Sequence, residues 1–245
     1  MKFVIRNEEK EKTAVLIPAG GLDETAFNPI MPYLEEYRVI IPVLDGSVIS
    51  EKSDMPDRKT EVSKITAGLK EHGTERIALL LGISYGATIA LEVLMTRKFQ
   101  VSRAVLDGGS FLQYGPLMRS MNYIGTSFFA AGIRKNPDKP TMYAGLGEEA
   151  DRHSRQIFTN MSKASLKMLI NDSMSGVKYV EGGIRREYNL LVMYGDKDGY
   201  KGGIKWFEKH HCPFEKTILK GYGHCEYLYQ NPEGYVKRYL LQEEL

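Results

Sequence analysis

A serine between two glycines, at the junction of a strand-like run and a helix-like run, most constrains what this chain can fold into. The run is residues 77–94, IALLLGISYGATIALEVL. Its first five residues are all apolar, as expected of a strand buried on both faces of a parallel sheet. The apolar residues after the glycines continue as a mostly buried helix. Gly82 and Gly86 let strand and helix approach closely, so Ser84 lies on a tight turn and is a candidate nucleophile.

Short β-type runs alternate with amphipathic helical stretches along the rest of the chain, which predicts an α/β fold. The expected sheet is mostly parallel and flanked by helices on both faces. We expect strands at residues 2–6, 14–18, 38–43, 77–81, 103–106, 190–194 and 216–219. Helices are expected at residues 60–72 and from Asn231 and Pro232 onward, each with one apolar stripe.

Residues 110–186 break this alternation, because they carry a helical pattern without a clear strand over more residues than a crossover needs. We expect a helical lid inserted into an α/β core formed by residues 1–109 and 187–245. The lid is rich in Met, Phe and Tyr. Such residues line adaptable apolar pockets, but helix packing is the better expectation for most of them.

The net charge of +2 and the ordinary composition predict no nucleic-acid partner and no membrane partner. The first apolar run is too short for a signal peptide, and Cys212 and Cys225 are too few for a disulfide framework, so a cytoplasmic location is expected. His210, His211 and Cys212 lack a second ligand cluster, so neither a metal nor another cofactor is expected.

The order of motifs resembles the α/β-hydrolase superfamily, specifically its small members with a helical lid. Its core is GISYG around Ser84, and the segment LLVMYGDKDGY supplies a strand followed by Gly195-x-x-Asp198. The segment KTILKGYGHCEYL supplies the last strand and then His224 in a glycine-rich loop. The resemblance covers nearly the whole chain and implies the chain order serine, acid, histidine.

A serine hydroxyl is a poor nucleophile until a neighbouring imidazole accepts its proton, and His224 is the expected base. A carboxylate on the far ring nitrogen fixes the imidazole tautomer. The resemblance assigns this role to Asp198, because the acid comes three residues after the glycine. Asp196 is the nearest rival and is expected to stabilise its loop instead. Asp107, after the strand that follows GISYG, is a further alternative.

The resemblance implies two backbone donors for an oxyanion, one from Tyr85 and one from the loop PAGGL. In that loop Gly20 is favoured over Gly21 as the second donor, although both glycines fit a simple tight turn. The loop departs from the family pattern because Pro18 and Ala19 stand where a His-Gly pair is common.

The expected function is a serine hydrolase that cleaves a small acyl ester or thioester through a Ser-His-Asp triad and an acyl-enzyme intermediate. Its partner is a small-molecule acyl substrate, and the lid composition suggests an apolar or aromatic acyl group. The sequence does not distinguish cleavage of these bonds from cleavage of amide or carbon–carbon bonds.

The alternative, motivated by the irregular PAGGL loop, is a non-catalytic or very slow ligand-binding protein on the same scaffold. A protein-docking role for the lid has little support, because no exposed apolar run is evident, and no pattern fixes the oligomeric state.

Overall fold

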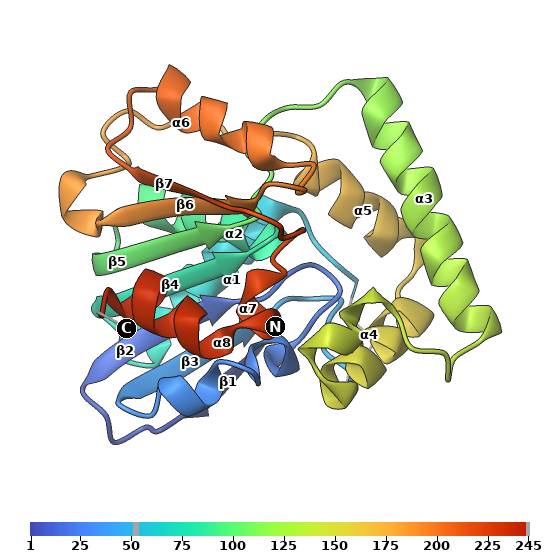
Figure 1. Ribbon diagram of the computed structural model, residues 1–245, viewed down its shortest axis with the longest axis horizontal. Coiled ribbons are helices and arrows are strands. Elements are labelled where there is room, and N and C mark those ends of the chain that lie inside the picture. Colours follow the sequence, from blue (N-terminus) through green and yellow to red (C-terminus); the bar gives the residue numbers. More distant parts are fainter. Residues whose placement is uncertain (51–53, 244–245) are drawn as a thin grey trace.

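The computed structural model describes residues 1–50 and 54–243, and within them seven strands form one sheet in the order β1-β3-β2-β4-β5-β6-β7 (Figure 1). The strands are β1 (Lys2–Arg6), β2 (Lys12–Ile17), β3 (Tyr37–Val43), β4 (Arg76–Ile83), β5 (Gln100–Asp107), β6 (Leu190–Gly195) and β7 (Glu215–Leu219). Each lies where an apolar run predicted it, with small shifts at its ends. The expected α/β class is confirmed.

The strands are parallel except β1, which pairs with β3 in the antiparallel direction. The pairing of Ile83 with Asp107 and of Gly195 with Leu219 sets the carboxyl ends of four strands nearly level. The loops that follow these ends therefore gather at one edge of the sheet, where open α/β sheets bind their ligands.

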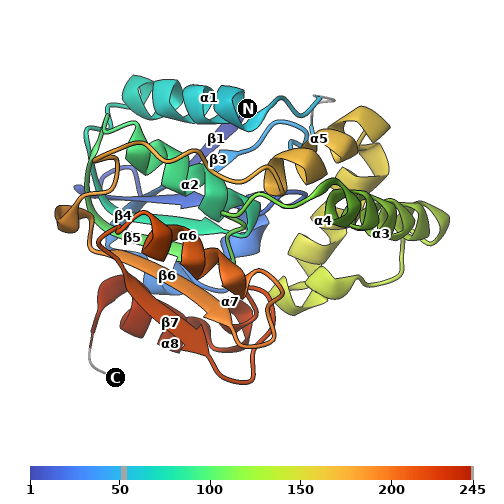
Figure 2. The same ribbon diagram turned by 90° about the horizontal axis from the view of Figure 1, so that it is seen from above.

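Helices cover both faces of the sheet, as expected. One face carries α1 (Arg58–Glu71), α2 (Tyr85–Met95) and α6 (Ile204–Lys209), and the other carries η1 (Glu24–Phe27), η2 (Met31–Tyr33), α7 (Tyr227–Gln230), α8 (Pro232–Gly234) and η6 (Tyr235–Leu241). Figure 2 shows α1 and α2 running side by side. Each face buries its own apolar cluster, with Ile65 and Ile89 in one and Phe27 and Val236 in the other.

Residues 110–186, here called the helical segment, lie between β5 and β6. They contain α3 (Pro116–Lys135), η3 (Met142–Leu146), α4 (Glu148–Asn160), α5 (Lys163–Ser173) and the start of η4 (Arg186–Tyr188). The structure describes all of these residues, and their one β pairing is an isolated bridge between Gln113 and Ser175. Figure 1 shows α3, α4 and α5 beyond the carboxyl ends of the strands.

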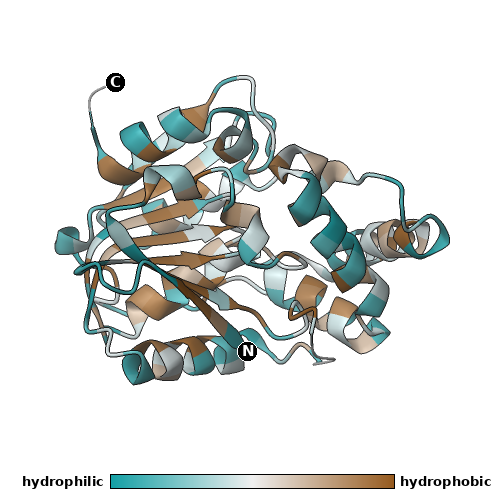
Figure 3. Cartoon of the chain, turned by 90° about the horizontal axis from the view of Figure 1, so that it is seen from below, coloured by the Kyte–Doolittle hydropathy of each residue, from teal (hydrophilic) through white to brown (hydrophobic). Residues whose placement is uncertain are grey.

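The hydropathy of the elements follows this layering: the strands are the most continuously apolar part of the core (Figure 3).

The last helix differs from expectation: after α8 the chain continues as the π-helix η6 instead of one regular α-helix. Its Tyr235, Val236 and Leu240 are nevertheless buried against the sheet. None of the helices in residues 1–50 and 54–243 has the length and apolar character that a membrane crossing requires.

Candidate active site

Ser84 lies directly after β4 in a backbone conformation that non-glycine residues rarely adopt, with φ 53° and ψ −120°. Its backbone N–H donates to the Asp107 carbonyl at 2.7 Å, and its own carbonyl accepts from the Ala87 N–H at 3.0 Å as α2 begins. Both bonds hold the strained turn in place. The Ser84 side chain therefore projects above the sheet edge at the start of a helix.

The two glycines beside Ser84 are required by the close approach of backbone segments. A Cβ atom at Gly82 would lie 2.4 Å from the carbonyl oxygen of Gly86. A Cβ atom at Gly86 would lie 2.2 Å from the carbonyl oxygen of Ile17, at the end of β2. Any larger residue at either position would push α2 away from the sheet, so the pattern Gly-x-Ser-x-Gly follows from packing.

His224 connects Ser84 to Asp198 through both of its ring nitrogens. Its Nε2 is 2.8 Å from Ser84 Oγ, and its Nδ1 is 2.8 Å from Asp198 Oδ2. The other Asp198 oxygen accepts from the Tyr200 backbone N–H at 2.7 Å, and Asp198 is 1 % exposed. The loops after β4, β6 and β7 thus bring together the three side chains that the motif order singled out.

The two rival carboxylates are engaged elsewhere. Asp196 accepts from the Gly221 backbone N–H at 2.9 Å and so joins the loops after β6 and β7. Asp107 accepts from the Tyr235 hydroxyl at 3.1 Å on the far side of the sheet edge. Burial raises the pKa of Asp107 to about 7. The carboxylate that contacts His224 is that of Asp198.

The protonation of His224 is set by opposing effects. Burial lowers its pKa, whereas the hydrogen bond to Asp198 and the negative charge of that carboxylate raise it, and the pKa lies above its ordinary value. The neighbouring Cys225 is protonated near neutral pH, because burial raises the pKa of its thiol to about 11. It is therefore a poor rival nucleophile beside Ser84.

The loop PAGGL forms a turn in which the Leu22 N–H donates to the Ala19 carbonyl at 3.1 Å. Gly20 lines a cavity beside Ser84 together with Tyr85. Gly21 adopts a positive φ of 81° and is buried beneath Phe158, whose Cζ would lie 2.5 Å from an added Cβ atom. Of the two candidate glycines, Gly20 is the one whose backbone faces the cavity.

The cavity beside Ser84 has a volume of about 400 Å³ and lies between the sheet edge and the helical segment. Apolar side chains of the helical segment form most of its outer wall. They are Phe129, Met142, Tyr143, Leu146, Phe158, Leu169 and Ile170. Phe129 packs edge-to-face on Phe158 with ring centroids 5.2 Å apart, while Tyr143 stacks on Phe158 at 6.4 Å. An apolar group fits this space better than a charged one.

Two residues of the site were missed at the sequence level. The Tyr200 ring lies 5.4 Å from the His224 ring, and its hydroxyl accepts from the Asn122 side chain at 3.0 Å. Asn122 lies on α3 and lines the cavity with Thr126. The spacing of residues 122, 126 and 129 marks one face of a helix, but the sequence does not show that this face meets Tyr200.

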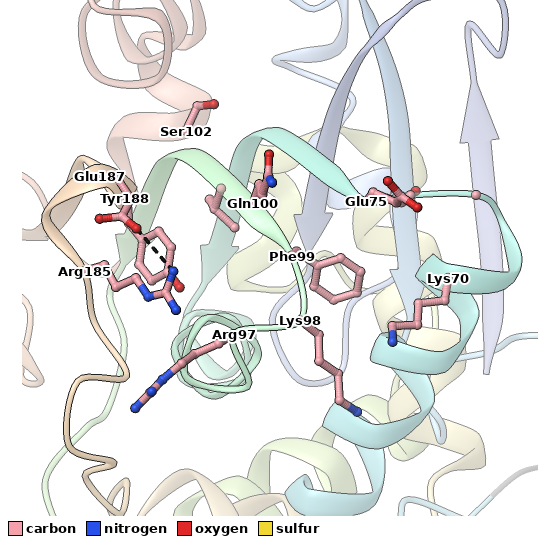
Figure 4. Close-up of a pocket in the computed structure, with 13 residues that line it drawn as sticks. Lys70, Glu75, Arg97, Lys98, Phe99, Gln100, Ser102, Arg185, Glu187 and Tyr188 are labelled. Carbon is pink, nitrogen blue, oxygen red and sulfur yellow. Dashed lines mark hydrogen bonds and ion pairs between the residues drawn. The ribbon is translucent and has the colours of Figure 1, made fainter.

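A larger depression lies at the amino ends of β4 and β5, at the opposite edge of the sheet from Ser84 (Figure 4). Its volume is about 1000 Å³, and exposed charged side chains stand around it: Lys70, Glu75, Arg97, Lys98, Arg185 and Glu187. Arg185 pairs with Glu187 at 3.3 Å. Among its described lining residues, no nucleophile is hydrogen-bonded to a base, so it is not the candidate active site.

Of residues 210–212, His210 and Cys212 contact neighbouring residues, whereas His211 is exposed. His210 stacks on Tyr179 with ring centroids 4.4 Å apart, and the Cys212 thiol contacts the His210 carbonyl. In the part of the chain that the structure describes, no group of three or more His, Cys, Asp or Glu residues is arranged to hold a metal ion.

Solved structures share this architecture at low sequence identity. An α/β-hydrolase family protein from Desulfitobacterium hafniense matches with a TM-score of 0.72 at 18% identity, over 95% of this chain and 96% of that one. A carboxylesterase from Nitrososphaera gargenis matches with a TM-score of 0.71 at 14% identity, over 96% and 90%. Carboxylesterase CesB from Bacillus subtilis matches with a TM-score of 0.65 at 17% identity, over 94% and 83%. No protein-family model matches the sequence, and no curated protein matches it significantly.

Proposed function

We propose that this chain, which has the α/β-hydrolase fold, is a serine hydrolase that cleaves a small acyl ester or thioester. The observation that carries the proposal is the unbroken hydrogen-bond chain from Ser84 Oγ through the His224 imidazole to the buried Asp198 carboxylate. A binding protein would have no need of a serine held in a strained turn against a base. The alternative of a ligand-binding scaffold therefore has less support.

In the proposed reaction, Ser84 Oγ attacks the carbonyl carbon of the substrate as His224 Nε2 accepts the hydroxyl proton. The resulting imidazolium is stabilised by Asp198, which accepts the Nδ1 proton in a hydrogen bond and stays ionised. Burial of Asp198 strengthens this interaction because little water screens it. The product of the step is a tetrahedral intermediate covalently bound to Ser84.

The oxyanion of that intermediate needs donors in fixed positions. The backbone N–H of Tyr85, the residue after the nucleophile, is one proposed donor. The backbone N–H of Gly20 is the other, because Gly20 lines the cavity beside Ser84 whereas Gly21 is buried under Phe158. Leu169 occupies the space that a Cβ atom at residue 20 would need, so glycine fits best at this position.

Collapse of the intermediate breaks the bond to the leaving group, and His224 donates its Nε2 proton to the departing oxygen or sulfur. The acyl group remains on Ser84 as an ester. Water then attacks this ester with His224 again as the base, and a carboxylic acid leaves while Ser84 regains its proton. No step requires a metal or an organic cofactor.

The acyl group is proposed to occupy the apolar cavity between Ser84 and the helical segment. The cavity holds about 400 Å³, and its wall includes the aromatic rings of Phe129, Tyr143 and Phe158. Burial raises the pKa of Tyr143 to about 12, so its hydroxyl is a neutral group here. A compact apolar or aromatic acyl group matches this lining, and in this role residues 110–186 act as a lid.

A cytoplasmic location is part of the proposal. Cys212 and Cys225 are both free, and Cys225 lies in the cavity wall beside His224. Oxidation of a thiol at this position would add oxygen atoms next to the proposed base. A reducing compartment keeps the cavity in the form described.

Steady-state hydrolysis of nitrophenyl esters with acyl chains of increasing length, beside a matched thioester, tests the proposal. Wild type should turn over at least one ester, with apolar or aromatic acyl groups preferred over acetate. Ser84→Ala should lower kcat by roughly 10⁴-fold or more, because no other group in the cavity is an activated nucleophile. Turnover that persists in Ser84→Ala would contradict the proposal, and so would a folded wild type inactive on every ester and thioester.

A further inference from the structure

Helix α3 exposes an apolar face that nothing in the described chain covers. Leu117, Met121, Ile124 and Phe128 are 75 %, 60 %, 53 % and 75 % exposed, and Met118 beside them is 50 % exposed. Their spacing of three and four residues places the first four on one side of the helix. Figures 1 and 2 show α3 at the outer margin of the molecule, away from the sheet. A contiguous apolar surface of this kind marks an interaction site.

The charge around this face is positive. Helix α3 contains Arg119, Arg134 and Lys135 and not one acidic residue, and the helical segment holds eleven Lys and Arg against six Asp and Glu. Arg119 donates to the Tyr114 carbonyl, and Arg134 donates to the carbonyls of residues 158, 159 and 161. These two arginines are thus held by backbone carbonyls, but Lys135 lies five turns after Leu117, on the same side of α3, and is exposed. Within residues 1–50 and 54–243, neither Lys135 nor the exposed Lys139 forms an ion pair, so these two charges can meet an external anion.

The apolar face of α3 is continuous with the mouth of the cavity. The adjoining side of the same helix lines the cavity through Asn122, Gly125, Thr126 and Phe129. Met142 lines the cavity as well, yet its side chain is 69 % exposed, so it lies at the rim. A molecule held against the outer face of α3 is therefore one helix width from the space above Ser84.

We propose that α3 docks on an anionic lipid surface and that the acyl ester reaches Ser84 from that surface. An amphipathic helix with apolar side chains toward the lipid and basic residues around them binds the interface of a bilayer and lies parallel to it. A second copy of this chain fits the face less well, because it would bring the same unpaired positive charge against itself. Only the delivery of substrate depends on the proposed hydrolase function.

The sequence-level expectation of no membrane partner came from the net charge of the whole chain. That average combines a positive helical segment with a core that carries a net negative charge. The expectation of no exposed apolar run was wrong for α3, because Leu117, Met121, Ile124 and Phe128 project into solvent instead of packing. Binding to a lipid layer depends on the local surface of α3 and not on the net charge of the whole chain.

Co-sedimentation with vesicles tests the proposal with full-length protein. Wild type should bind vesicles of phosphatidylcholine and phosphatidylglycerol in equal parts, and binding should weaken with added salt and on pure phosphatidylcholine. The double variant Ile124→Asp with Phe128→Asp should lower the partition coefficient by roughly 100-fold or more, because two charges would enter the apolar layer. The matched control is Val180→Asp, which adds a charge at another exposed apolar residue and should leave binding unchanged.

Hydrolysis of a soluble short-chain ester should be the same in wild type and in the double variant, because neither residue 124 nor residue 128 lines the cavity. Absence of vesicle binding by wild type would overturn the inference. Equal binding by the double variant would overturn it too, as would a wild-type dimer that the double variant dissociates without any vesicle binding. A wild type that does not hydrolyse the soluble ester would instead contradict the proposed function. Vesicle binding would still test the docking of α3 on its own.

Discussion

The two walls of the cavity are built in different ways. On the sheet side, polar bonds fix each group: Ser84 is held by the Asp107 carbonyl, and Asp198 is held by the Tyr200 backbone N–H. On the side of the helical segment, the wall is made of apolar side chains such as Phe129 that contact one another through their rings. For the proposed reaction, the difference implies that proton transfer would depend on the core, whereas the choice of acyl group would depend on the helical segment.

Polar contacts join the helical segment to the core at several places. His153 on α4 pairs with the buried Asp23 at 2.7 Å, just after the PAGGL loop, and Asn28 donates to Glu149 at 3.0 Å. On the other face of the sheet, the Arg58 guanidinium donates to the carbonyls of residues 172 and 176. Phe129 takes part in none of these polar contacts, so a substitution there should affect the groups on the sheet side only weakly.

The largest effect is expected from the acid on the core side. Asp198→Asn should lower kcat by roughly 10⁴-fold, because the amide favours the wrong imidazole tautomer and does not stabilise the imidazolium. Asp196→Asn is the matched control, since that carboxylate contacts the Gly221 N–H and not His224. Steady-state kinetics of both variants on the preferred ester decides between them. A large loss in Asp196→Asn with little loss in Asp198→Asn would break the assignment.

A smaller and more selective effect is expected in the helical segment. Phe129→Ala should lower kcat/KM for an aromatic acyl ester by about 10- to 100-fold and change the acetate ester much less, because it removes packing around the acyl group. Phe128→Ala is the matched control, since the neighbouring side chain points outward and is 75 % exposed. Equal losses on both esters in Phe129→Ala would mean that this wall does not select the acyl group.

The fold follows largely from local patterns. Apolar runs predicted the inner strands, because a parallel strand covered by helices has no polar face. The edge strands β1 and β7 carry shorter apolar runs beside exposed residues, and they too were predicted. The position of Ser84 was equally local, since it depends on two glycines that the packing requires. The choice between Gly20 and Gly21 could not be made from local sequence. It depends on the turn geometry and on Phe158, which is more than a hundred residues away.

The helical segment was harder to predict for a physical reason. Periodicity reveals that a helix has an apolar face but not what covers it. Met161 and Met174 are buried, as expected of packing residues, whereas Met118 and Met121 are exposed on α3. The contact between Asn122 and Tyr200 joins residues 78 positions apart, and no sequence motif predicts that they meet.

The smallest expected effect is a shift in pH dependence. His224 must be neutral to accept the Ser84 proton, so reactivity should be low at acidic pH and rise as pH passes through the His224 pKa. Because that pKa is raised, the midpoint should lie above the ordinary value of about 6.5. In Asp198→Asn the midpoint should move to lower pH, since a carboxylate that raises the pKa is lost. Asp107 also has a pKa of about 7, so its titration could be mistaken for that of His224. Asp107→Asn is the control, and it should leave the midpoint in place.

Labelling with a fluorophosphonate, followed by intact mass and measured across pH, tests the central claim that His224 activates Ser84. Wild type should gain one adduct, located on Ser84, at a rate that rises with pH through the His224 midpoint. Ser84→Ala should gain none, and His224→Ala should react at a rate lower by several orders of magnitude. A folded wild type that stays unlabelled would contradict the account, as would labelling that persists in both variants.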